Sequence, residues 1–233
     1  MNVNDFLSAL GAEFFTGVPD SKLRPLVDHL MDTYGVHSSA HVIAVNEGSA
    51  AALAAGYHLA TGKTPLVYLQ NSGLGNLVNP LLSLLHEEVY GIPCIFVVGW
   101  RGEPDRHDEP QHLVQGRLSV PLLATMGVQT FVLMRETAAA EVAAWREEMR
   151  PRLAAGGQCA ILVRDGALTY PKRTYGNAYA LRREEAIAHI LDAAGDAVIV
   201  ATTGKTGREL FELRERRGED HAHDFLTVGS MGH

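Results

Sequence analysis

The stretch HVIAVNEGSAAALAAGYHLATGK, residues 41–63, contains one acid, Glu47, in an otherwise apolar run. Strand-like residues lead into Asn46 and Glu47, and a helix of Gly, Ser and Ala is predicted to follow at once. No basic residue stands beside Glu47 in the sequence to pair with it. A buried strand that turns directly into a closely packed helix indicates an α/β fold.

Two interpretations of Glu47 follow from this position. In the first, it is a helix cap or first-turn acid, which the helix dipole and free N–H groups stabilise by under about 1 kcal/mol. In the second, the small residues Gly48, Ser49 and Ala50 let a neighbouring element enclose the carboxyl group. An enclosed carboxyl can hold or share a proton near neutral pH, because desolvation disfavours its charged form. The second interpretation makes Glu47 a general acid–base group.

Composition narrows the class of protein. The 233 residues are 46% hydrophobic and 20% charged, with a formal net charge of −7. That charge argues against nucleic acid or an anionic membrane as a partner, whereas a few local cations suffice for a small anionic substrate. No apolar run approaches the roughly 20 residues of a membrane span, and no secretion signal is readable. Cys94 and Cys159 lie in strand-like runs, as expected for buried thiols in a reducing cytosol, so a cytoplasmic location is expected.

Apolar runs of strand length alternate with helical periodicity along the first part of the chain. The predicted strands are 13–16, 41–45, 65–69, 94–99, 130–133 and 159–164, with helices that include one from about 137 to 153. Continuous rather than alternating hydrophobicity indicates a parallel sheet covered on both faces. The predicted fold class is therefore α/β, a doubly wound parallel sheet.

The pattern then restarts. Residues 166–181 are polar, with Pro, Gly and Tyr, and are interpreted as a linker between a domain at 1–165 and a second one at 182–233. The second part predicts a helix at 182–194, a strand at 197–202, a helix at 206–217 and a strand at 225–228. Two and a half βα units do not close a doubly wound domain, so this second α/β domain is predicted to be incomplete.

The run NEGSAAALAAGYHLATGK resembles the pyrimidine-binding domain of thiamine-diphosphate enzymes, in which a Glu at this junction hydrogen-bonds N1′ of the aminopyrimidine. QNSGLGN (70–76) falls where that superfamily carries a Ser-Gly-Pro-Gly turn, with Leu74 in place of the proline. Five further motifs, FFTGVPDS, GWRGEP, DEPQH, TTGKTGRELFE and GSMGH, resemble the phosphonopyruvate decarboxylases, to which the sulfopyruvate decarboxylases are close relatives.

The resemblance implies thiamine-diphosphate-dependent, non-oxidative decarboxylation of 3-phosphonopyruvate to phosphonoacetaldehyde and CO2, or of sulfopyruvate. Glu47 would share a proton with N1′. Asp20 falls where other 2-oxo acid decarboxylases place an Asp after the first strand. Those enzymes also have one or two histidines in the pocket, and His112 is the one candidate for that role here. These three residues are the expected catalytic groups.

The resemblance also implies cofactor and substrate residues. Met231 would force the cofactor into its bent shape, and the Gly229 backbone would accept from the 4′-amino group. The remaining expected cofactor residues are Ser72, Gly73, Thr203 and Gly204, besides Glu47. The expected substrate donors are Ser21, Lys22, Asn71, Arg101, Gln111 and His112, for each of which the alternative is a solvated surface position.

The family holds Mg2+ and the diphosphate with a Gly-Asp-Gly segment and a later Asn, and nothing in this sequence matches them. We therefore expect no metal ligand in this chain. Either the chain is a fragment of a longer polypeptide, which we favour, or a separate chain supplies the rest of the diphosphate-binding domain. The resemblance implies a homo-oligomer, a dimer or a tetramer, whose interface would use the helices at 49–57 and 76–85.

Three other interpretations stay open. His107, Asp108, Glu109 and His112 resemble metal ligands, but their spacing fits no zinc pattern, and Pro110 is expected to interrupt a helix that would align them. Gly73 and Gly75 could cradle a nucleotide phosphate, although the third glycine of a dinucleotide fingerprint is missing. The chain could also be a scaffold subunit that kept the fold without catalysis.

Overall fold

The computed structural model describes residues 1–171, 176 and 178–227. The chain divides into two compact units, Met1–Lys172 and Arg173–His233. Among the described residues, no helix combines the length and the apolar character that a membrane-crossing segment requires. Val228, Gly229 and Met231, which the sequence analysis places in a strand and a cofactor loop, lie outside the described residues.

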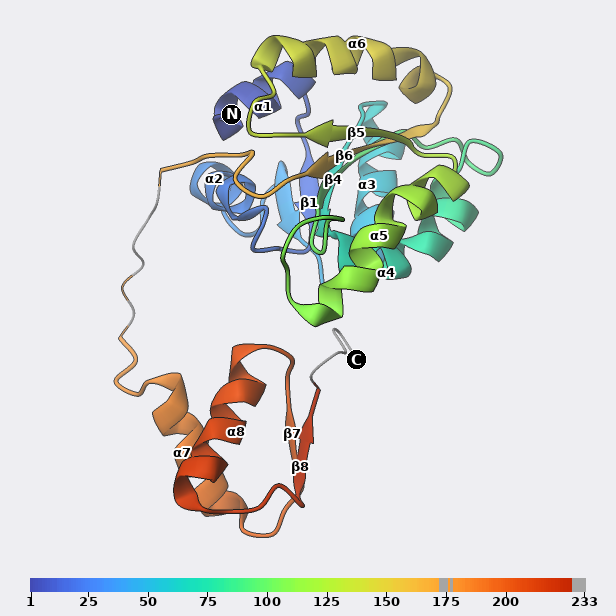
Figure 1. Ribbon diagram of the computed structural model, residues 1–233. Coiled ribbons are helices and arrows are strands. Elements are labelled where there is room, and N and C mark those ends of the chain that lie inside the picture. Colours follow the sequence, from blue (N-terminus) through green and yellow to red (C-terminus); the bar gives the residue numbers. More distant parts are fainter. Residues whose placement is uncertain (172–175, 177, 228–233) are drawn as a thin grey trace. The chain divides into compact units, whose positions relative to one another are not determined.

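A six-stranded parallel sheet forms the centre of the first unit (Figure 1). Its strand order is β2-β1-β3-β4-β6-β5, and every neighbouring pair is parallel. The strands are β1 (Phe15–Gly17), β2 (His41–Ile43), β3 (Leu66–Gln70), β4 (Cys94–Gly99), β5 (Gln129–Leu133) and β6 (Gln158–Val163). The doubly wound α/β fold expected from the continuous apolar runs is confirmed.

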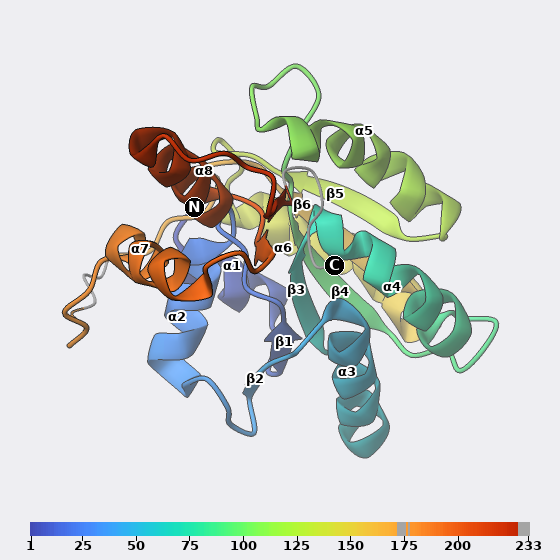
Figure 2. The same ribbon diagram turned by 90° about the horizontal axis from the view of Figure 1, so that it is seen from below.

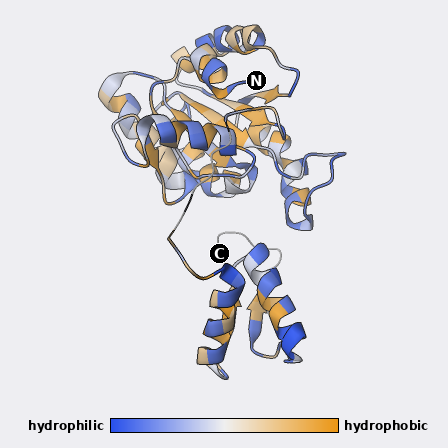
Figure 3. Cartoon of the chain, turned by 90° about the vertical axis from the view of Figure 1, so that its left-hand side faces the viewer, coloured by the Kyte–Doolittle hydropathy of each residue, from blue (hydrophilic) through white to orange (hydrophobic). Residues whose placement is uncertain are grey.

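Helices cover both faces of this sheet (Figure 2). They are α1 (Val3–Leu10), α2 (Arg24–Tyr34), α3 (Glu47–Thr61), α4 (Leu74–Pro80), α5 (Pro110–Thr125) and α6 (Ala139–Ala154), with short helical turns η1 (Asn71–Gly73) and η2 (Leu81–Leu85). The side chains of each strand alternate between the two faces, so one sequence run feeds two cores. Figure 3 shows the hydrophobic colour concentrated in the strands.

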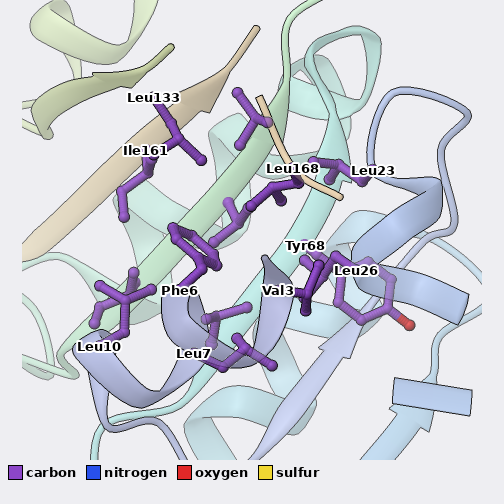
Figure 4. Close-up of a cluster of buried hydrophobic side chains, with 14 of the residues drawn as sticks. Val3, Phe6, Leu7, Leu10, Leu23, Leu26, Tyr68, Leu133, Ile161 and Leu168 are labelled. Atoms are coloured by element: carbon purple, nitrogen blue, oxygen red, sulfur yellow. The ribbon is translucent and has the colours of Figure 1, made fainter. Parts of the chain in front are cut away.

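The first core lies between the sheet and α1, α2 and α6. Phe6, Leu26 and Tyr68 are among its fully buried side chains, and Figure 4 shows them converging on the sheet. The second core lies between the opposite face and α3, α4 and α5, where alanines of α3 meet larger side chains such as Leu77 and Phe96. Small residues on α3 let this helix approach the sheet closely, as the Ala-rich sequence predicts.

The strand order reverses between β1 and β3. The chain runs from β1 outward to β2, then returns across β1 to form β3 on its other side. Beyond the carboxyl ends of parallel strands at such a reversal, the connecting segments diverge and leave a crevice where α/β proteins bind ligands. Residues that follow β1 and β3, which include Asp20 and Ser72, are therefore placed at the expected binding edge.

The packed chain of the first unit extends beyond residue 165. Ala167 and Leu168 are buried in the first core, and Thr169 N donates to Met1 O at 2.8 Å. The start of the segment expected to be a linker, residues 166–181, is thus held against α1. The polar composition of residues 166–181 did not indicate this packing. The burial of Ala167 and Leu168 is enough to fix the start of the segment on the core.

The second unit contains α7 (Arg183–Ala194), β7 (Ile199–Ala201), α8 (Lys205–Arg217) and β8 (Asp224–Leu226). The two strands are parallel, and a small core of Ile187, Leu191, Ala201 and Leu210 joins them to the helices. The opposite face of the strands stays uncovered by the described residues, with Val200 69% and Phe225 61% exposed.

Candidate active site

Glu47 is the first residue of α3 and is buried, with 8% of its surface exposed. The helix cap is supplied by its neighbour Asn46, whose Oδ1 accepts from Ser49 N at 2.8 Å. The carboxylate of Glu47 is therefore not needed as a cap. It turns toward α4, where Asn76 Nδ2 donates to Oε2 at 2.8 Å. Its other oxygen, Oε1, has no hydrogen-bond donor among the described residues.

Gly73 makes room for this carboxylate. A Cβ atom on residue 73 would lie 2.1 Å from Glu47 Oε1 and 2.3 Å from Cδ. The carboxylate can keep this position only while residue 73 has no side chain, so the Gly in QNSGLGN positions Glu47. From the sequence, Gly73 is expected only as a cofactor residue, and its close approach to Glu47 is not foreseen.

Asp20, after β1, is the second buried carboxylate of this edge. Its Oδ1 accepts from Gln70 Nε2 at 2.5 Å, and its Oδ2 accepts from Lys22 N at 2.9 Å. Gln70 Oε1 in turn accepts from Ser72 Oγ at 2.7 Å. Gly99 leaves the space, since a Cβ there would lie 2.2 Å from Asp20 Oδ2. The structure thus joins Asp20 and Ser72 through Gln70, a residue that the sequence analysis did not select.

Asn71 is buried and its amide is saturated by protein. Nδ2 donates to Arg101 O at 2.8 Å and to Ser119 Oγ at 2.9 Å, and Oδ1 accepts from Arg101 N at 3.0 Å. Both amide hydrogens are used, so this geometry favours positioning of the Arg101 turn over the substrate contact expected from the sequence.

Arg101 is held by Asp108. Its Nε donates to Asp108 Oδ2 at 2.8 Å, Nη2 donates to Oδ1, and Nη1 donates to Ser21 Oγ at 3.3 Å. The guanidinium holds the pKa of Asp108 far below its usual range, because hydrogen bonds from Arg101 stabilise the carboxylate. The pair leaves Arg101 largely neutralised, so its charge is less available to a substrate than the sequence suggests. Lys22 is likewise paired, with Asp165 at 3.2 Å.

His112 lies in the first turn of α5 and is 4% exposed. Burial lowers its pKa, and the nearby positive charge of Arg101 lowers it further, against opposing effects of Asp108 and Asp20. Its Nδ1 is buried without a hydrogen-bond partner among the described residues. A neutral imidazole beside Asp20 and Arg101 can exchange a proton with a bound ligand.

Pro110 does not interrupt a helix here. It occupies the first position of α5, where proline is favoured because that N–H has no helical partner. Gln111 and His112 are therefore helical residues of α5. Among the described residues, no group of three or more potential ligands is arranged to hold a metal ion.

Thr203 and Gly204 belong to the second unit. Thr203 Oγ1 donates to Thr227 O, and Gly204, with φ 98°, precedes α8. The turn between β7 and α8 thus has the strand-to-helix form expected of a phosphate-binding loop. Gly229 and Met231 lie outside the described residues, so the second expected cofactor contact is not described.

A family model matches this architecture: residues 2–122 match the thiamine pyrophosphate enzyme, N-terminal TPP binding domain. The chain belongs to the thiamine pyrophosphate enzymes. This domain implies thiamine diphosphate as the cofactor. The free oxygen of Glu47, the glycine beneath it and the buried polar groups at the switch point fit one edge of such a cofactor.

Within this family the chain is a homologue of decarboxylases. It is 34% identical over 97% of its length to phosphonopyruvate decarboxylase of Streptomyces hygroscopicus, of which it covers 58%. It is 31% identical over 52% of its length to the sulfopyruvate decarboxylase subunit alpha of Methanococcus maripaludis, of which it covers 68%. The curated relatives that the chain matches within this family are thus decarboxylases. The chain spans somewhat more than half the length of the phosphonopyruvate decarboxylases that it matches.

A solved 4-hydroxybenzoylformate decarboxylase of Rhodococcus jostii RHA1 is also similar, at 19% identity. The similarity covers 90% of this chain and 41% of that one, with a TM-score of 0.48. It is too weak to add to the family assignment.

Among the residues that sequence reasoning missed, Gln70 and Asn76 stand at the two ends of QNSGLGN. Their position, one polar residue at each end of a glycine-containing turn, could have identified them as site residues. Asp108 and Ser119 gave no such signal, because their partners Arg101 and Asn71 are 7 and 48 residues away.

Proposed function

We propose that this chain carries the pyrimidine-binding part of a thiamine-diphosphate-dependent decarboxylase that converts 3-phosphonopyruvate to phosphonoacetaldehyde and CO2. The observation that carries this proposal is the buried carboxylate of Glu47, held by Asn76 with one oxygen free, at the binding edge of a chain 34% identical to phosphonopyruvate decarboxylase.

The bound cofactor supplies a nucleophilic carbon that adds to the keto carbon of a 2-oxo acid and accepts the electron pair left by CO2. The residues of this chain supply proton control and orientation. Glu47 Oε1 holds a proton at N1′ of the pyrimidine, and Asn76 fixes the carboxylate for that task. Burial of Glu47 keeps competing water away from this hydrogen bond.

Asp20 and His112 form the proton-transfer side of the proposed site. Asp20 is fixed by Gln70, and His112 is kept neutral by burial. Ser21, Arg101 and Gln111 stand around them and would orient the anionic substrate, with Arg101 shared between Asp108 and the substrate. Mg2+ and the diphosphate would be held outside the first unit, with Thr203 and Gly204 contributing N–H groups.

Sulfopyruvate is the second candidate substrate. The observation that favours it is the similarity to sulfopyruvate decarboxylase alpha subunits, of which this chain covers about two thirds. Phosphonate and sulfonate groups accept hydrogen bonds from the same kinds of donor, so Ser21 and Arg101 could bind either group. Decarboxylation rates of the complete enzyme with the two acids separate them.

We also propose a partner, either a second copy of this chain or a chain that supplies the remaining part of the enzyme. Apolar side chains on and beside α3 and in η2 are left uncovered by the described residues, with Val45 90%, Leu53 40% and Leu82 42% exposed. Val45 precedes α3, Leu53 lies within it, and Leu82 lies in η2, so Leu53 and Leu82 fall in the segments 49–57 and 76–85 that the sequence analysis expected at an interface. Sedimentation velocity that shows a monomer at every concentration would exclude the second-copy form.

The experiment that tests the function replaces Glu47 by Gln in the complete enzyme. Glutamine keeps the shape but cannot share a proton, so we expect decarboxylation and hydrogen–deuterium exchange at thiazolium C2 to fall by at least about 10³-fold. Thermal unfolding should stay unchanged. An E47Q enzyme with undiminished exchange would refute the proposal, and Glu88→Gln, at an exposed position, is the matched control.

A further inference from the structure

A second polar cavity lies next to the candidate active site, beyond the carboxyl ends of β4 and β6. Its volume is about 490 Å³, and its cationic lining consists of Lys22, Arg106, Arg135 and Arg164. We refer to it as the arginine pocket. The catalytic proposal does not use Arg106, Arg135 or Arg164.

The carboxylates of this pocket are mostly occupied already. Glu103 pairs with Arg164, and Asp165 pairs with Lys22. Asp108 also lines the pocket, but its oxygens are taken by Arg101. Glu136 is the remaining acid of the lining.

The two other guanidinium groups are free. Neither Arg106 nor Arg135 has a carboxylate partner among the described residues, so two free guanidinium groups face one free acid. Arg164 Nη2 forms an ion pair with Glu103 Oε1, but neither that oxygen nor Arg164 Nε has a hydrogen-bond partner in the described part of the chain, so Nε remains available as a donor. Arg106 and Arg135 are exposed, so water solvates their N–H groups in the absence of a ligand. An oxyanion can replace this water, because its oxygens accept several charge-assisted hydrogen bonds at once.

The backbone is shaped to bring these arginines together. Asp105 has φ 63°, a left-handed conformation that turns the chain back, and Arg106 N donates to Glu103 O at 3.3 Å. Gly166, with φ 70°, leaves the space for Arg135, since a Cβ at residue 166 would lie 2.6 Å from Arg135 Nη2. Two unusual backbone positions thus place Arg106 and Arg135 over one cavity.

We propose that the arginine pocket is a second oxyanion site, which binds a small phosphonate or phosphate dianion at Arg106, Arg135 and Arg164. The two free guanidinium groups and the carboxylate of Glu136 leave one net positive charge, and the buried Nε of Arg164 adds a further donor, so the lining favours an oxyanion. The pocket shares Asp108 with Arg101, and it shares Lys22 with the loop that carries Asp20. Its occupant therefore sits directly behind the substrate loops of the proposed enzyme.

The test is calorimetric titration of the whole chain, without thiamine diphosphate, with methylphosphonate and with inorganic phosphate. Saturable binding of either dianion at millimolar or lower concentration is expected, with methanesulfonate, a monoanion, binding at least about fivefold more weakly. Arg106→Ala and Arg135→Ala should each weaken binding by about tenfold. The matched control is Arg117→Ala, an exposed arginine of α5 outside the pocket lining, which should leave it unchanged.

The two ligands separate the sources of the anion. Tighter binding of methylphosphonate would identify a phosphonate ligand, and equal or tighter binding of phosphate would identify a phosphate. Absence of saturable binding, or binding that neither arginine variant weakens, would overturn the proposal. Because the titration needs no cofactor, its failure is distinguishable from failure of the Glu47 experiment.

Discussion

Two glycines determine where the acids of the candidate site can lie. Gly73 lies against the carboxylate of Glu47, and Gly99 lies against that of Asp20, each closer than any side chain would permit. The carboxylates are thus positioned by the absence of a Cβ as much as by their donors. Such positions are visible in the sequence only as glycines, without the acid they serve.

Gly73→Ala is predicted to impair catalysis while the fold survives. The new Cβ would meet the flexible end of Glu47, so the side chain moves and the core does not. In the complete enzyme we expect kcat to fall by at least about 100-fold, because a displacement of about 1 Å in a proton-sharing group costs this much. Steady-state kinetics and thermal unfolding measure the two effects.

Gly75→Ala is the matched control, since no atom lies within 4 Å of the new Cβ at that position of α4. Its activity should equal that of the unchanged enzyme. If Gly73→Ala retained full activity, the carboxylate position seen here would not be the one that works in catalysis.

His41 is predicted to make stability depend on pH. It is fully buried, with Nδ1 2.6 Å from Gly35 O and Nε2 2.8 Å from Tyr68 Oη. Nδ1 therefore donates to the Gly35 carbonyl, and in the neutral ring Nε2 accepts from the Tyr68 hydroxyl. Burial lowers the pKa of His41 below its ordinary value of 6.5, against a smaller opposing effect of the Gly35 carbonyl.

As pH falls, His41 takes up a proton in the unfolded chain before it does so in the folded protein, because its pKa is lower in the folded protein. The stability contributed by neutral His41 is complete above pH 6.5 and is lost as pH falls from there toward the lowered pKa. His41→Asn should be less stable at pH 7.5, and its deficit should shrink toward pH 5. Urea unfolding at several pH values measures this, and a deficit that is constant with pH would contradict it.

At the scale of elements, α5 is fixed on the turn that follows β4. Trp100 Nε1 donates to Gly116 O at 3.0 Å, and a Cβ at Gly116 would lie 1.6 Å from Gly102 O. Two glycines thus let a helix and a turn touch backbone to backbone. This contact places His112 beside Arg101.

Gly116→Ala is predicted to destabilise the first unit by about 2 kcal/mol or more, because backbone rather than a flexible side chain opposes the new methyl group. Gly56→Ala on α3 is the control. Its Cβ meets nothing within 4 Å, so it should stabilise by about 0.5–1 kcal/mol through helix propensity. Urea unfolding compares the two, and a stabilised Gly116→Ala protein would show that α5 is not packed in this way.

The strands and most helices followed from the sequence to within a few residues, because runs such as PCIFVVG are both apolar and β-branched. The helices α1 and α5 were not predicted from the sequence. The first turn of α5 is polar and begins at a proline, so its pattern is that of a loop. Its helical state depends on the contact with the 100–102 turn, which periodicity does not encode.

At the scale of the whole molecule, the two units differ in how completely they bury their apolar surface. The first has two cores, one on each face of its sheet. The second has helices on one face and leaves strand residues such as Val200 exposed. The stability of the chain is therefore expected to reside in the first unit.

Residues 1–172 alone are predicted to fold, with an unfolding midpoint within about 3 °C of that of the first transition of the whole chain. Residues 173–233 alone should unfold without a cooperative transition, because the four side chains buried among its described residues make a marginal core. Calorimetry of the two pieces measures both. A shorter piece, 1–165, would lose Ala167 and Leu168 and should be less stable than 1–172.

The sequence by itself determined the parallel sheet, the restart after residue 181 and the unusual position of Glu47, because these depend on local apolar runs and on a single acid among small residues. Only the tertiary structure decided how the site is assembled. It showed that Asn46 is the cap, that Gly73 and Asn76 hold Glu47, and that Asn71, Arg101 and Lys22 already have partners. The physical reason is that, apart from the local Asn46 cap, these partners follow different strands of the sheet and are distant in the chain, so their competition for each polar group exists only once the chain is folded.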